Sequence, residues 1–118
     1  PPPLYRSSAA SDVYKRQARI SHLPHVVAVV CALVALERED DGRLAGGGLR
    51  DTSRVAAGDP LMWTEILMEN RRELLAPLRE CAGMLNEIAG LLEEEKEKPL
   101  AAVLEDAQRR RQQLRSTA

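Results

Sequence analysis

The sequence predicts an all-α fold of about four main helices. Apolar residues recur at helical spacing through most of the chain, and no run alternates between apolar and polar residues as a half-buried strand does. The 118 residues include no phenylalanine and only 3% aromatic residues, so the core must consist of Leu, Val, Ile, Ala and Met. These residues suit helices better than sheets, and the length allows one domain with one modest core.

Residues 1–17 are expected to be a disordered or non-native leader. Three leading prolines and a cluster of Ser and Ala show no helical or strand period. The segment has no initiator Met and no apolar run of the kind found in a secretory signal. We interpret it as a translated cloning or sequencing scar and take residues 18–118 as the domain.

The first helix is expected over residues 19–38. Its central run, from Val26 to Leu36, is apolar almost all round, which predicts burial on most sides in a segment too short to span a bilayer. Pro24 predicts a kink or a helix start, because proline lacks an N–H and clashes with the preceding turn. His22 and His25 could share a helix face, but no third zinc ligand lies close by, so structural, hydrogen-bonded histidines remain the alternative.

A charged turn at residues 37–45 leads into three consecutive glycines, Gly46 to Gly48, and a short helix ending near Ala57. Asp51 is expected to cap this short helix, with Arg54 one turn further on. The planar guanidinium of Arg54 matches the two oxygens of a carboxylate. The alternative is that Arg54 pairs with Asp51 or Asp59 and merely ties the loop down. The glycines are not a dinucleotide fingerprint, because no strand precedes them.

Asp59 and Pro60 predict the next helix start, a cap residue followed by proline. Residues 60–97 are expected to form one long helix, or two with a bend, because leucines recur with a period near 3.5 residues. Pro77 interrupts this seam and predicts a kink. Residues 99–115 are expected to form the last helix.

The charges and cysteines exclude several classes of function. The net charge of −1 gives no general attraction to nucleic acid or to an anionic membrane. The run Arg109-Arg110-Arg111 is short, lacks aromatic residues for base stacking, and suits the dipole at a helix C-terminus. Cys31 and Cys81 lie in apolar contexts without nearby metal ligands, so reduced thiols are expected and no metal site is predicted.

Five short motifs together resemble the C-terminal domain of prephenate dehydrogenases, a family that includes the arogenate dehydrogenases. The motifs are SHLPH at Ser21–His25, GGG at Gly46–Gly48, RDTSR at Arg50–Arg54, DPLMW at Asp59–Trp63 and ENR at Glu69–Arg71. They occur in the family's order. The resemblance implies an all-α dimerisation domain in a homodimer, located in the cytoplasm, with no nucleic-acid or membrane partner.

The resemblance also implies the reaction and the residues that serve it. Such enzymes of tyrosine biosynthesis oxidise prephenate or arogenate with NAD or NADP, and prephenate yields 4-hydroxyphenylpyruvate and carbon dioxide. Arg54 matches the family arginine that binds a substrate carboxylate, and His25 and Ser21 match polar residues that face the substrate cleft. The residues expected to shape or gate that cleft are Asp51, Trp63, Gly47 and Gly48.

The family's catalytic histidine and its glycine-rich cofactor loop lie in an N-terminal domain that has no counterpart in this sequence. No catalytic or cofactor-binding residue is therefore expected here, and the chain alone is expected to be inactive. A stand-alone helical dimerisation or regulatory module is the competing hypothesis. It explains the long apolar seam but gives no role to an arginine beside a glycine turn.

Overall fold

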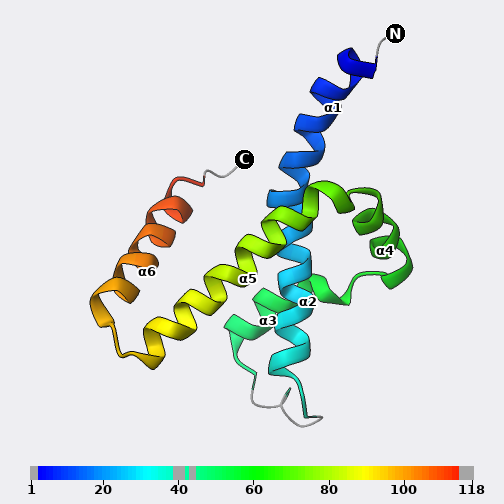
Figure 1. Cartoon of the computed structure of the whole chain (residues 1–118). Helices are drawn as coiled ribbons and strands as arrows, with labels where there is room; N and C mark the ends of the chain where they lie inside the picture. Colours follow the sequence, from blue (N-terminus) through cyan, green and yellow to red (C-terminus); the bar gives the residue numbers. More distant parts are fainter. Residues whose placement is uncertain (1–2, 39–41, 43–44, 115–118) are drawn as a thin grey trace. The chain divides into compact units, whose positions relative to one another are not determined.

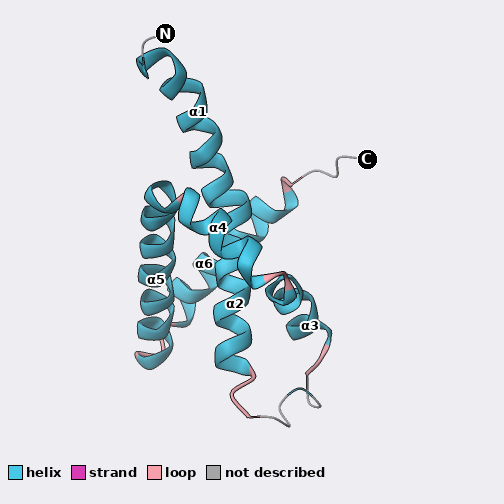
Figure 2. Ribbon diagram, turned by 90° about the vertical axis from the view of Figure 1, so that its right-hand side faces the viewer, coloured by secondary structure: helices cyan, strands magenta, loops and turns pink. Residues whose placement is uncertain are grey.

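The computed structural model describes residues 3–38, 42 and 45–114, and it describes side chains from residue 9 onward. The all-α prediction is confirmed, because helices account for most of the described residues and no strand occurs among them (Figures 1 and 2). By its internal contacts the chain divides into two compact units, residues 1–78 and 79–118. We describe each unit by itself.

The first unit begins with helix α1 (Pro3–Gln17), which corrects the expectation of a disordered leader. Helix α1 runs through a π-helical turn, η1 (Ala18–His22), directly into α2 (Leu23–Ala35) (Figure 1). Extending an existing helix costs far less than nucleating one, so α2 can propagate into residues with weak helical period of their own. The non-native origin of the segment stays a prediction.

The π-helical turn lies just before Pro24, which occupies the first turn of α2. No helix starts near Pro24, because the helical backbone continues through the π-helical turn into α2. Proline offers no N–H to the preceding turn and crowds the carbonyl four residues before it, and a wider π turn relieves both problems.

Continuity of these elements gives the chain a longer apolar helix than the sequence indicated. Among the described residues, the run Ala9–Ala35 is long and apolar enough to cross a membrane by length and composition. Residues 19–38 alone had been expected to be too short. One such helix is weak evidence for a membrane, because core helices of soluble proteins meet the same criterion.

Helix α3 (Gly47–Ser53) and the 3-10 turn η3 (Arg54–Ala57) pack beside α2 (Figures 1 and 2). Asp51 does not cap this helix as predicted, since it lies inside α3. The N-cap is Gly46, in an extended conformation, and its carbonyl accepts the Arg50 N–H at 3.2 Å. The helix therefore begins within the glycine run, earlier than the side-chain pattern indicated.

Helix α4 (Pro60–Glu69) begins as predicted, with the Asp59 carboxylate accepting the Leu61 N–H at 3.1 Å. Helix α5 (Arg71–Glu93) follows after a break at Asn70. Pro77 lies inside α5 and is buried, so it does not end the helix, and the kink predicted there stays a prediction. The predicted long segment is thus two helices, divided at Asn70.

In the second unit, α5 ends in a tight turn and α6 (Glu97–Gln112) follows. The Lys96 N–H bonds the Leu91 carbonyl at 2.9 Å and the Glu95 N–H bonds the Leu92 carbonyl at 3.2 Å. These two bonds define a Schellman motif, in which the residue at Glu95 takes a left-handed conformation. Glu95 has φ of 54° and is the one non-glycine residue with positive φ in the described part of the chain.

Replacing Glu95 with glycine is expected to stabilise the chain by about 0.5–1 kcal/mol. The left-handed conformation costs a non-glycine residue roughly 1–2 kcal/mol, and the greater flexibility of unfolded glycine offsets only part of that. Chemical denaturation at fixed protein concentration measures the change. Glu93→Gly, at the last residue of α5, is the control and should destabilise by up to about 1 kcal/mol. Equal destabilisation by both variants would contradict the assignment.

Candidate functional site

A cluster of aromatic rings lies where α4 meets α2 in the first unit. The Trp63 indole stacks on the His25 ring, with 3.7 Å between ring centroids and 13° between planes. The His22 ring meets the same indole edge-on, at 6.4 Å and 85°. Both histidines are buried, His25 at 5% and His22 at 6% exposure. The predicted sharing of a face by these histidines is borne out by their common contact with Trp63.

Gly58 makes room for Trp63. A β-carbon at Gly58 would lie 2.8 Å from the Trp63 Nε1 atom and 2.9 Å from its Cδ1 atom, closer than such atoms approach one another. Any side chain at position 58 would therefore push the indole away from its present place. Sequence reasoning missed Gly58. The available signal was a glycine directly before the helix start that carries the tryptophan.

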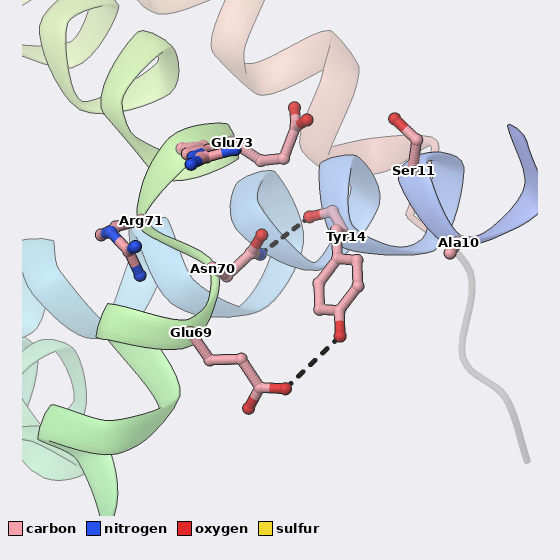
Figure 3. A pocket seen from close by; sticks show the side chains of 8 residues that line it. Ala10, Ser11, Tyr14, Glu69, Asn70, Arg71 and Glu73 are labelled. Carbon is pink, nitrogen blue, oxygen red and sulfur yellow. Dashed lines mark hydrogen bonds between the residues drawn. The ribbon is translucent and has the colours of Figure 1, made fainter. Parts of the chain in front are cut away.

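Asn70 connects the cluster to the end of α1. Its side-chain amide nitrogen lies 2.9 Å from the Tyr14 backbone carbonyl and 3.1 Å from the His22 Nδ1 atom. Figure 3 shows the Asn70 side chain reaching Tyr14, whose hydroxyl points toward Glu69 at 3.4 Å. Asn70 is 3% exposed, so these contacts are shielded from solvent. The sequence analysis quoted Asn70 in a motif but gave it no role.

Two cavities adjoin this connection, and both are lined in part by Tyr14, Glu69 and Asn70. The one shown in Figure 3 has a volume of about 370 Å³ and is bounded by Ala10, Ser11, Tyr14 and residues 69–73. The other, also about 370 Å³, is bounded by α1, η1 and α4. We call this second one the histidine cavity; its lining includes Gln17, Ser21, His22, Trp63, Ile66 and Asn70.

The predicted site residues are only partly brought together. Ser21 is exposed and lines the histidine cavity, whereas His25 lies under Trp63 and does not line it. Arg54 is exposed on η3, which packs against α2, and the described residues show no hydrogen bond from Arg54 to either histidine. The described residues show no ion pair from Arg54 to Asp51 or Asp59. Asp51, Gly47 and Gly48 are exposed on α3, and the roles of all these residues remain predictions.

Burial lowers the pKa of His25 below its ordinary value of 6.5, and the charge of the neighbouring His22 lowers it further. Burial disfavours the charged imidazolium, and a second positive charge close by has the same direction of effect. His25 is thus held neutral under its tryptophan cover. A neutral imidazole can stack on the indole without any loss of hydration of a charge.

We expect the chain to lose stability as the pH falls through about 6.5, because unfolded His25 takes up a proton more readily than folded His25. His25→Phe keeps a flat ring against Trp63 and should flatten this part of the pH profile. The melting temperatures of the unsubstituted chain and of His25→Phe, recorded between about pH 8 and about pH 5, measure this pH dependence of stability. His22 is present in both, so the difference isolates His25. Parallel profiles would contradict the prediction.

The described residues contain no set of three His, Cys, Asp or Glu side chains placed to hold a metal ion. Cys31 and Cys81 are free and half-buried. The described residues also lack strands, so they provide no strand–turn–helix unit of the kind that binds a dinucleotide.

Comparison with known proteins shows a match to the family described as prephenate dehydrogenase, dimerization domain, over residues 14–106. The chain is 34% identical over 82 residues to prephenate dehydrogenase of Bacillus subtilis (strain 168), covering 64% of this chain and 22% of that protein. It is 39% identical over 66 residues to cyclohexadienyl dehydrogenase of Zymomonas mobilis, covering 52% and 22%. The match begins inside the segment that the sequence analysis set aside as a leader.

Solved structures that resemble this chain come from the same family. Arogenate dehydrogenase of Synechocystis superposes with a TM-score of 0.80 at 29% identity, covering 86% of this chain and 38% of that one. Prephenate dehydrogenase of A. aeolicus, solved in complex with hydroxyphenyl propionate and NAD+, gives 0.71 at 30% identity, covering 84% and 36%. The chain spans about a fifth of the length of the curated relatives it matches.

Proposed function

The chain belongs to the prephenate dehydrogenase family, where it corresponds to the dimerization domain, and from this we propose that it binds substrate and forms the homodimer interface in a prephenate or arogenate dehydrogenase. The whole enzyme carries out the NAD- or NADP-dependent oxidative decarboxylation of prephenate, or the matching oxidation of arogenate. It acts in tyrosine biosynthesis, in the cytoplasm. The chain by itself does not transfer hydride.

Substrate recognition in this proposal rests on the guanidinium of Arg54, which forms no ion pair among the described residues. Prephenate carries two carboxylates, and a planar guanidinium can bind one of them through two parallel hydrogen bonds. Arg54 is exposed and has no ion pair among the described residues, so its fork is available to a ligand. It lies on η3, which packs against α2, the helix that carries His25. The absence of an ion pair among the described residues favours a role for Arg54 in binding a substrate carboxylate over a role in holding the loop through Asp51 or Asp59.

Trp63 acts as a movable cover in this proposal. His25 matches a cleft-facing residue of the family, yet its ring is stacked under Trp63. A substrate that reaches His25 must therefore displace the indole. Ser21 is already exposed beside the histidine cavity, so a ligand can contact the serine before the cover opens.

The dimer interface is proposed to include the outer face of α2. Apolar side chains one helical turn apart are exposed there: Val27 by 38%, Val30 by 46% and Val34 by 72%. Leu33, beside them, is exposed by 71%. A contiguous apolar strip of this kind usually marks a contact with a partner, and a second copy of the same helix is complementary to it in an isologous dimer.

Titration of the chain with hydroxyphenyl propionate, followed by tryptophan fluorescence, tests the proposal. Trp63 is the single tryptophan, so a change in emission reports movement of the cover off His25. We expect saturable binding accompanied by a change in tryptophan emission. The variant Trp63→Phe has no tryptophan, so its binding is measured by calorimetry, and we expect it still to bind the probe. A folded chain that shows no binding at millimolar probe, on the order of the weakest specific affinities, would contradict the proposed function.

A further inference from the structure

The hydrogen bonds of Asn70 fix the orientation of its amide. A backbone carbonyl only accepts hydrogen bonds, so the group that faces the Tyr14 carbonyl at 2.9 Å must be the amide NH₂. The same nitrogen lies 3.1 Å from the His22 Nδ1 atom. The NH₂ group carries two hydrogens, and the one not used by Tyr14 is available to His22. Because the acceptor is a backbone carbonyl, this contact does not depend on which side chain stands at position 14.

This arrangement in turn sets the tautomer of His22. Because the amide nitrogen only donates, the Nδ1 atom of His22 must accept, and the neutral ring then carries its proton on Nε2. Within the described residues no hydrogen bond to His22 Nε2 is recorded, and no buried side-chain nitrogen or oxygen lacks a partner. The Nε2 atom is therefore reached by solvent, and His22 lines the histidine cavity.

We propose that Asn70 is a positioning residue, which holds His22 so that its Nε2–H donates into the histidine cavity to a carboxylate oxygen of the ligand. The inference rests on the proposed function and deepens it, because it adds a second recognition point for a substrate with two carboxylates, besides Arg54. Ser21 supplies a hydroxyl at the same cavity. Glu69 also lines it, with one carboxylate oxygen facing the Tyr14 hydroxyl.

Two substitutions at His22 separate the two sides of its ring. His22→Gln places an amide nitrogen near the former Nε2 atom and keeps a donor at the cavity. His22→Asn places its amide near the former Nδ1 atom, which keeps the contact with Asn70 and removes the donor from the cavity. With prephenate as the probe, because it carries both carboxylates, we expect His22→Gln to bind within about threefold of the unsubstituted chain. His22→Asn is expected to bind about tenfold more weakly.

The role of Asn70 has a spectroscopic test that a packing role would not affect. Nitrogen and carbon NMR shifts of the His22 ring distinguish a proton on Nε2 from one on Nδ1. In mildly alkaline buffer, the unsubstituted chain should show the Nε2–H form of the His22 ring. Asn70→Asp has nearly the same shape but offers only acceptors, so it should move the proton to Nδ1.

The outcomes divide clearly. An Nδ1–H tautomer in the unsubstituted chain, or an unchanged tautomer in Asn70→Asp, would overturn the positioning role. Equal probe affinity of His22→Gln and His22→Asn would overturn the donor role. If Arg54→Lys weakens binding while both His22 variants bind normally, this inference fails and the proposed function stands. If only His22→Asn weakens binding, the Arg54 anchor fails instead.

Discussion

Arg54→Lys is expected to weaken the binding of hydroxyphenyl propionate by about ten- to a hundredfold. A charge-assisted hydrogen bond of this kind contributes roughly 1.5–3 kcal/mol. Lysine keeps the positive charge but loses the planar fork that meets two carboxylate oxygens at once. Calorimetric titration of the chain measures the affinity. In the whole enzyme, the same change should raise the apparent KM for substrate and leave cofactor affinity nearly unchanged.

Arg50→Lys is the matched control. Arg50 belongs to the same RDTSR run and is also exposed, on α3, so it reports the general effect of replacing an arginine here. We expect it to leave probe affinity within about twofold, as exposed charges contribute little. A loop-staple role for Arg54 predicts a lower melting temperature and unchanged probe affinity. That combination would show that Arg54 is not a substrate anchor.

Val34→Asp is expected to convert the dimer into monomers. The substitution enters an isologous interface twice, once from each copy, and an unpaired charge buried there costs several kcal/mol. The dissociation constant should rise by more than about a hundredfold. Sedimentation velocity at tens of micromolar, on the order where mass action favours an obligate dimer, measures the change.

Thr52→Asp serves as the control for added charge. Thr52 is exposed on α3 and does not belong to the apolar strip of α2, so this variant should sediment like the unsubstituted chain. Circular dichroism of Val34→Asp should remain helical, because the substitution lies on an exposed face. A stable monomer of the unsubstituted chain at the same concentration would refute the dimer proposal outright.

Local signals in the sequence were sufficient for much of the fold. The helix start at Asp59 and Pro60 is set by a cap bond between residues two apart, and the structure shows that bond. The apolar periods over α2, α5 and α6 are likewise properties of single segments. Family membership was also readable, because the motifs SHLPH and RDTSR are short and contiguous, and the family match confirms it.

Local signals failed where a segment's state depends on its neighbours. Residues 3–17 have weak helical character alone, yet they continue a helix that α2 and the π turn already establish. The sequence predicted a kink at Pro77 within residues 60–97 and gave no local signal for a break at Asn70. The structure breaks the helix at Asn70, whose side chain bonds the Tyr14 carbonyl and His22 instead.

The sequence by itself determined the helical class, the helix start at Asp59 and Pro60 and the family of this protein, since periodicity, capping and motifs act over a few neighbouring residues. Only the tertiary structure decided what surrounds each histidine. The stacking of Trp63 on His25, the space that Gly58 leaves for it, and the hydrogen bond of Asn70 to His22 join different helices. Asn70 and His22 are 48 residues apart, and only chain packing brings such a pair within bonding distance.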